Sequence, residues 1–156
     1  MGGVPATVPL AWFAMAVPSR EVARAVLGPA RGGLAGRVVL GSALLTAWDL
    51  FLDPQMTGEG YWRWERRGRY RGIPGSNYLG WFASGLGVIA LLDRLLPAEA
   101  AERPEPSLVG AYGWMAVMST LGFAAFFGDP LVAAAGGAAM VPAAVVAARR
   151  TWRWPT

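Results

Sequence analysis

The 156-residue sequence has no cysteine, no histidine and no lysine, and only 15% of its residues are charged. Without cysteine and histidine, the chain cannot form disulfides, use a thiolate or an imidazole, or hold zinc or haem through those ligands. Any proton transfer must therefore use Asp, Glu, Tyr or Arg. We expect neither a metal site nor a cofactor.

The remaining composition is that of a membrane protein. Hydrophobic residues make up 54% of the chain, whereas soluble domains carry about 25% charged residues. A membrane-spanning helix needs about 20 apolar residues. We therefore predict an all-α fold, a polytopic helical bundle of four to five transmembrane helices in a single domain, residues 1–156.

The apolar runs between charged residues locate the helices at about 5–18, 38–53, 77–96, 107–127 and 130–148. Three prolines in the first run predict a kinked or half-length helix. The second helix is expected to end at Asp53, because the residue before a proline avoids the helical conformation. Residues 1–19 lack a charged side chain, so we expect them to belong to the protein rather than to a secretory signal.

The charge distribution predicts topology rather than nucleic-acid binding. The net charge is +4, and the arginines fall in short segments between apolar runs, which is typical of membrane loops. With five helices crossing, nine arginines share one side and five the other. Residues 20–37 are expected to be solvated or interfacial, and the side with nine arginines to be cytoplasmic in a bacterial membrane.

Pairs of small residues, Gly80 with Ser84 and Ala133 with Gly137, have the spacing of close helix contacts.

The segment 49–82 concentrates four carboxylates and five arginines between apolar runs. Asp49 and Asp53 are one helical turn apart, about 6 Å on one face. Two like charges that close in an apolar setting do not both ionise cheaply, so one carboxyl is expected to keep its proton. Such an acid suits protonation of an alkene. The structural alternative is that Asp53 caps a turn with Pro54 and Asp49 pairs with a loop arginine.

Other polar and aromatic residues of this segment have two interpretations each. Glu59, between two glycines, and Glu65 are candidates for catalysis or for ion pairing with nearby arginines. The aromatic side chains belong either to an interfacial belt or to the wall of an apolar ligand site, where ring faces stabilise a cation. Asn77 follows a turn-forming stretch and can both donate and accept hydrogen bonds.

Three strings in this segment carry a resemblance to a known family. They are Ala47-Trp-Asp-Leu-Phe-Leu-Asp-Pro-Gln-Met56, Gly60-Tyr-Trp-Arg-Trp64 and Gly68-Arg-Tyr-Arg-Gly-Ile-Pro-Gly-Ser-Asn-Tyr-Leu-Gly-Trp81. They resemble the carotenoid-biosynthesis membrane proteins, which include carotenoid hydratases that act on γ-carotene and on bisanhydrobacterioruberin. Residues 4–16 are similar to the helix that precedes these strings in the family. Because family members have further helices upstream, the resemblance implies that this chain lacks their N-terminal part.

The resemblance implies hydration of the terminal 1,2 double bond of a C40 or C50 carotenoid that has a ψ end group. A proton goes to C2, a tertiary cation forms at C1, and water captures it to give a tertiary alcohol. Asp49 or Asp53 is the expected general acid, and the other carboxylate or Glu59 orients the water. Asn77 is expected to hold the water or the product hydroxyl, and the substrate walls are Trp48, Trp62, Trp64 and Trp81.

Two alternatives remain open from sequence. A carotenoid end-group cyclase begins with the same protonation but excludes water, so that a neighbouring alkene captures the cation. The second alternative is a non-catalytic membrane protein that needs no acid, either a scaffold that holds other carotenoid-biosynthesis enzymes or a truncated remnant. The expected partners are a carotenoid and the lipid bilayer, with other enzymes of the pathway as further candidates.

Overall fold

The computed structural model describes residues 7–31, 33–96 and 103–153. Within them the expected all-α fold is confirmed, because no strand forms and the only β-pairing is two isolated bridges between residues 68 and 73. The helices are α1 (Thr7–Arg31), α2 (Leu34–Gly58), α3 (Gly75–Leu95), α4 (Pro106–Leu121), the π-helical continuation η1 (Gly122–Phe126) and α5 (Pro130–Trp152).

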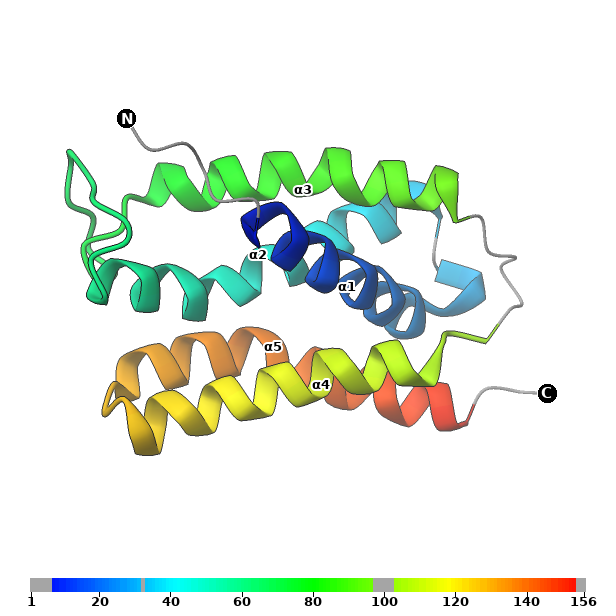
Figure 1. Cartoon of the computed structure of the whole chain (residues 1–156). Helices are drawn as coiled ribbons and strands as arrows, with labels where there is room; N and C mark the ends of the chain where they lie inside the picture. The colour runs from blue at the N-terminus through cyan, green and yellow to red at the C-terminus, as the bar shows by residue number, and fades with distance from the viewer. Residues whose placement is uncertain (1–6, 32, 97–102, 154–156) are drawn as a thin grey trace.

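The bundle consists of two helical hairpins, α2–α3 and α4–α5, with α1 packed against both (Figure 1). One end, here called the loop end, carries the 59–74 connection and the tight turn at Gly128 and Asp129 (Figure 1). The opposite end, called the linker end, carries the junction of α1 with α2, the start of α4 and the end of α5. The segments with nine arginines therefore share one end, as expected, whereas which end is cytoplasmic stays a prediction.

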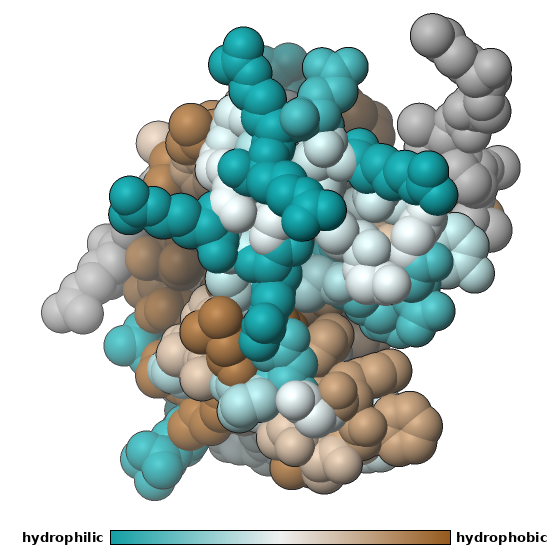
Figure 2. Space-filling model, turned by 90° about the vertical axis from the view of Figure 1, so that its left-hand side faces the viewer, coloured by the Kyte–Doolittle hydropathy of each residue, from teal (hydrophilic) through white to brown (hydrophobic). Residues whose placement is uncertain are grey.

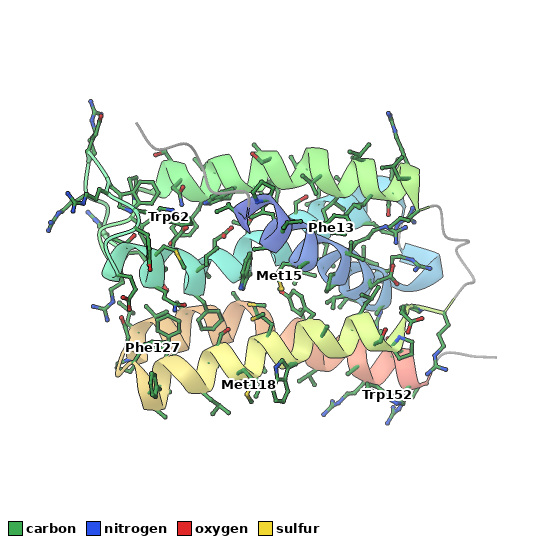
Figure 3. All side chains as sticks on the ribbon, viewed as in Figure 1. Phe13, Met15, Trp62, Met118, Phe127 and Trp152 are labelled. Carbon is green, nitrogen blue, oxygen red and sulfur yellow. The ribbon has the colours of Figure 1, made fainter. Side chains whose placement is uncertain are left out.

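Four of the described helices are long and apolar enough to cross a bilayer: α2, α3, α4 with η1, and α5. Large apolar side chains point outward from them, including Leu79, Trp114 and Phe126. Figure 3 shows Phe127 at the loop end and Trp152 at the linker end. An apolar exterior of this extent suits lipid rather than water, so the chain is a membrane protein.

Helix α1 differs from the expectation of a helix over 5–18 followed by a solvated segment. Residues 5 and 6 lie outside the described residues, and the helix continues to Arg31 with a break at Gly28, whose φ is +69°. Arg20 and Glu21 are only 4% and 3% exposed. The prediction that residues 20–37 are solvated or interfacial was therefore wrong in its first form for Arg20 and Glu21, because these charges have partners inside the bundle.

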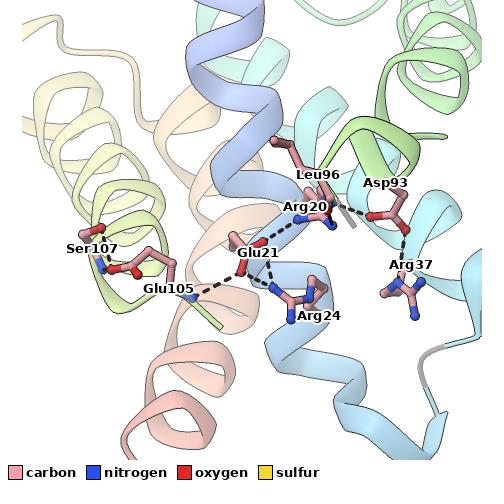
Figure 4. A network of polar contacts seen from close by, with 8 residues as sticks. All are labelled: Arg20, Glu21, Arg24, Arg37, Asp93, Leu96, Glu105 and Ser107. Atoms are coloured by element: carbon pink, nitrogen blue, oxygen red, sulfur yellow. Dashed lines mark hydrogen bonds and ion pairs between the residues drawn. The ribbon is translucent and has the colours of Figure 1, made fainter. Parts of the chain in front are cut away.

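Those partners form a network at the linker end (Figure 4). Arg20 donates to Glu21 at 2.7 Å, to Asp93 of α3, and to the Leu96 carbonyl. Arg37 of α2 donates to the other oxygen of Asp93 at 3.1 Å. Glu21 also accepts from Arg24 and from the Glu105 backbone N–H before α4. One network thus joins the ends of four helices and holds α1 against α3.

Close helix contacts depend on small residues, although not all of those expected. A Cβ on Gly85 would lie 3.2 Å from Ser42, whereas a Cβ on Gly80 meets nothing within 4 Å, and Ser84 is exposed. The α2–α3 contact is therefore one residue away from the predicted pair. Gly137 does lie at a contact, because its Cβ would approach Thr120 to 3.0 Å.

We predict that Asp93→Asn destabilises the bundle, because it leaves the buried Arg20 without its charged partner on α3. Removing one partner of a buried ion pair costs about 3–5 kcal/mol. Unfolding of the purified protein in detergent, followed by circular dichroism, measures the change. Arg94→Gln, at an exposed neighbouring position, is the matched control; equal effects of the two substitutions would refute the role of the network.

Candidate functional site

Helix α2 continues through Pro54 to Gly58, so the expectation that it ends at Asp53 was wrong. Proline has no N–H, and the carbonyl four residues earlier, that of Leu50, loses its helical partner. The hydroxyl of Tyr70, from the 59–74 connection, donates to this carbonyl at 2.8 Å. A side chain distant in sequence thereby replaces the missing backbone hydrogen bond and allows α2 another turn.

The continuing helix places Asp49 and Asp53, called here the acid pair, on one face and inside the bundle. Both side chains are fully buried, and neither forms an ion pair with a described residue. Asn77, in the first turn of α3, donates its Nδ2–H to Asp53 Oδ2 at 2.5 Å. Asp53 Oδ1 and both Asp49 oxygens have no hydrogen-bond partner among the described residues.

This arrangement rules out the structural alternative for both aspartates. Asp49 does not pair with a loop arginine, and Asp53 lies within α2 rather than capping a turn. A buried polar atom without a partner is rare, because its desolvation is not offset by a hydrogen bond. Three such oxygens on one helical turn make the acid pair the candidate site of this structure.

Aromatic residues of α3 and α1 surround the acid pair. Tyr78 lies within electrostatic reach of both aspartates. Trp81 faces Asp53, although its indole N–H lacks hydrogen-bond geometry. Trp12 of α1 stacks on Trp81 with ring centroids 4.4 Å apart. The polar atoms of Tyr78, Trp81 and Trp12 have no hydrogen-bond partner among the described residues, so Tyr78 and Trp81 bring free donors to the acid pair.

The structure brings together only part of the predicted site. Asp49, Asp53, Asn77 and Trp81 meet as described, and Trp48 is buried in the apolar core. The other three predicted residues, Glu59, Trp62 and Trp64, lie in the 59–74 connection and not beside the acid pair. Glu59 is exposed, and Trp62 and Trp64 are half-buried with ring centroids 6.4 Å apart.

Trp12 had no predicted role, and Tyr70 and Tyr78 were predicted only as aromatic residues of the segment, for an interfacial belt or a ligand wall. All three lie within the strings that carry the family resemblance or in the helix before them. The signal that points to Tyr70 is the proline at position 54, which predicts an unpaired carbonyl at Leu50. Trp12 and Tyr78 have no comparable signal, because only the packing of α1 and α3 on α2 shows where their polar atoms lie.

The 59–74 connection is itself ordered by local constraints. Gly68 pairs with Gly72, and a Cβ on Gly68 would lie 1.9 Å from the Ile73 carbonyl, so only glycine fits. Arg71 binds Asp129 at 2.5 Å, which ties this connection to the start of α5. Trp64 donates to the Thr57 hydroxyl at 3.0 Å. These contacts hold Tyr70 in place beside α2.

A cavity of about 660 Å³ opens at the loop end. It is lined by Thr57, Gly60, Trp62, Arg63, Trp64, Arg67, Arg71 and Gly72. Figure 3 shows Trp62 at this end of the bundle, and Figure 2 shows long hydrophilic side chains spread over one part of the same face. Thr57 is one helical turn beyond Asp53 on α2, so the cavity lies next to the acid pair but does not include it.

The fold and site define a polytopic α-helical membrane protein with a buried pair of carboxyls beneath a basic, aromatic connection. The chain matches the family described as "Carotenoid biosynthesis protein" over residues 1–154 and belongs to that family, as the three strings predicted. It is therefore a protein of carotenoid biosynthesis.

Among characterised relatives, the chain is 30% identical over 93 residues to the bisanhydrobacterioruberin hydratase of Haloarcula japonica. The alignment covers 60% of this chain but only 31% of that relative. No solved structure matches the chain.

We predict that Tyr70→Phe destabilises the protein by about 1–3 kcal/mol, because the half-buried Leu50 carbonyl loses its donor. Thermal unfolding in detergent measures this change. Tyr61→Phe, at a side chain that is 75% exposed, is the control. An unchanged melting temperature for Tyr70→Phe would show that the hydrogen bond does not support α2.

The same hydroxyl predicts a pH dependence. Burial, with a smaller contribution from the Asp129 charge, raises the pKa of Tyr70 to about 12 from 10.0. The unfolded chain thus releases this proton first, and the contribution of Tyr70 to stability is present below pH 10 and lost as the pH rises towards 12. Between pH 9 and 12, the free energy of unfolding should fall less in Tyr70→Phe than in the unaltered protein. Identical slopes for the two proteins would contradict this role of the Tyr70 hydroxyl.

Proposed function

We propose that this chain hydrates the terminal 1,2 double bond of a carotenoid ψ end group, in the cytoplasmic membrane of a bacterium. The observation that carries the proposal is the acid pair, which is fully buried and has no cationic partner among the described residues. Acidic residues in such a setting are costly and mark function. The family, and the hydratase activity by which the Haloarcula relative is named, support this choice of reaction.

Hydrogen bonding assigns the two roles within the acid pair. A donor to a carboxyl oxygen stabilises the carboxylate relative to the acid, and Asn77 supplies one to Asp53 alone. The proposal therefore has Asp53 as the carboxylate that orients water and Asp49 as the acid. The hydrogen bond from Asn77 supports this choice between the two aspartates.

In the proposed reaction, Asp49 gives its proton to C2 of the alkene, and the positive charge develops at the tertiary carbon C1. A water molecule held by Asp53 forms the C1–O bond and passes a proton to the Asp53 carboxylate. Transfer of that proton from Asp53 to Asp49 then restores the starting state, so the net change is the addition of one water molecule. No cofactor is needed for these steps.

The aromatic rings beside the acid pair supply the stabilisation of the cation. Trp81 and Tyr78 of α3 lie beside the aspartates, and Trp12 of α1 packs on Trp81. Each ring face is worth about 0.5–2 kcal/mol to a cation. Trp48 contributes to the apolar wall on α2. Glu59, Trp62 and Trp64, which lie at the loop end, take no part in the chemical step.

We predict that expression in a bacterium that makes lycopene and γ-carotene yields a pigment heavier by the mass of one water molecule. Asp49→Asn should lower its yield at least about 100-fold, the usual scale of a general acid. Asp53→Asn should lower it as well. Liquid chromatography with mass detection measures the product, and Glu65→Gln, at an exposed acid of the same segment, is the control. No hydrated product from the unaltered chain would contradict the proposal.

One observation favours a second candidate, the end-group cyclase. The acid pair has no exposure to solvent, and a cyclase requires exclusion of water so that a neighbouring alkene captures the cation. A cyclised product has the mass of its substrate but a shorter chromophore, and the same pigment analysis detects it. Pigments that depend on the chain but not on Asp49 or Asp53 would instead indicate a scaffold.

A further inference from the structure

The arginines at the two ends of the bundle differ in their partners. At the linker end, Arg20, Arg24 and Arg37 are held by Glu21 and Asp93. In the 59–74 connection only Arg71 has an acidic partner among the described residues, Asp129. The other four arginines of this connection, Arg63, Arg66, Arg67 and Arg69, form no ion pair within the described chain. Figure 2 shows this face, with hydrophilic side chains extending from it.

Two of these four arginines, Arg63 and Arg67, line the 660 Å³ cavity, and no acidic side chain lines it. A volume of 300–1,000 Å³ is typical of small-molecule sites. Two guanidinium groups without carboxylate partners form a site of strongly positive potential. Because each guanidinium presents paired N–H donors, it matches the oxygens of a phosphate group.

The remaining lining residues suit the same ligand. The Thr57 hydroxyl accepts from the Trp64 indole at 3.0 Å, which leaves its own hydrogen to donate to an anion. Gly60 and Gly72 have positive φ values, and a Cβ on either would meet nothing within 4 Å. Their lack of side chains keeps this wall of the cavity open.

The place of the cavity points to the source of the phosphate. It lies at the loop end, where α2 ends and α3 begins, and both are candidate membrane spans. Lipid headgroups lie at this level of a bilayer, and Trp62 and Trp64 are the residue type enriched there. Basic pockets beside membrane helices bind anionic lipid headgroups.

We propose that this cavity binds a phosphate group through Arg63 and Arg67, and that the phosphate belongs to the headgroup of an anionic membrane lipid. The site is separate from the acid pair, so the inference does not rest on the proposed hydration. Phosphatidylglycerol presents one such phosphodiester and is the probe for the experiment. Phosphatidylcholine carries the same phosphodiester together with a cation, which opposes binding to arginine.

The test is native mass spectrometry of the purified full chain in detergent, titrated with phosphatidylglycerol or phosphatidylcholine. The chain should retain phosphatidylglycerol preferentially, and Arg63→Gln with Arg67→Gln should weaken that retention at least about tenfold. Arg66→Gln with Arg69→Gln is the matched control, because it removes the same charge from the same connection outside the cavity lining. The control should change retention less than about twofold.

Three outcomes would overturn the proposal. Equal loss in both double variants would mean that the lipid responds to overall charge. Equal retention of both lipids, or no retention, would mean that the cavity does not select an anion.

If the double variant does not fold, judged by circular dichroism, the single variants Arg63→Gln and Arg69→Gln replace the two pairs in the same comparison.

A parallel titration with glycerol phosphate and inorganic pyrophosphate distinguishes the two sources of phosphate. Weak binding of both, with tight retention of phosphatidylglycerol, supports the lipid headgroup. Tight binding of a soluble phosphate that depends on Arg63 and Arg67 and displaces the lipid would establish the phosphate site but overturn the lipid as its ligand.

Discussion

The hydrogen bond from the Tyr70 hydroxyl to the Leu50 carbonyl is the contact on which the arrangement of the site depends. It replaces the bond that Pro54 cannot make, so that α2 remains helical on both sides of Asp53 and the two carboxyls share one face. It also brings the 59–74 connection back beside α2. That return starts α3 close to the last turns of α2, which puts Asn77 within reach of Asp53.

The two ends of the bundle differ in whether charged residues form ion pairs. At the linker end, buried arginines and acids neutralise one another, and their energy holds helices together. Towards the loop end, the acid pair is buried without a cation while four arginines of the adjacent connection extend without an acid. The acid pair and these arginines therefore have no ion-pair partner among the described residues, which distinguishes them from the network at Arg20.

Some features of the fold and of the candidate site could be predicted from the sequence and others could not, depending on the kind of interaction that forms each feature. Apolar runs gave the number and type of the helices, because burial in lipid leaves a long signal in the chain. The acid pair followed from its spacing on one helical turn. The course of α2 past Pro54 and the burial of Arg20 did not follow, because each depends on a partner distant in the chain, Tyr70 or Asp93. Glu59, Trp62 and Trp64 were predicted to join the acid pair from nearness in sequence, whereas the connection turns away from the bundle interior after Gly58.

Helix α1 is held by different kinds of contact along its length. In Figure 1 it starts near the middle of the bundle's length and runs to the linker end, where ion pairs anchor it. Near its start it is held to α3 by the stacking of Trp12 on Trp81, a contact worth about 0.5–1.5 kcal/mol beyond its buried area, while Leu10 and Phe13 face outward. Charged contacts therefore fix α1 at Arg20, whereas its first half is fixed by aromatic and apolar contacts, including those of Met15 and Ala16 in the core. The two halves of one helix thus depend on different physical forces.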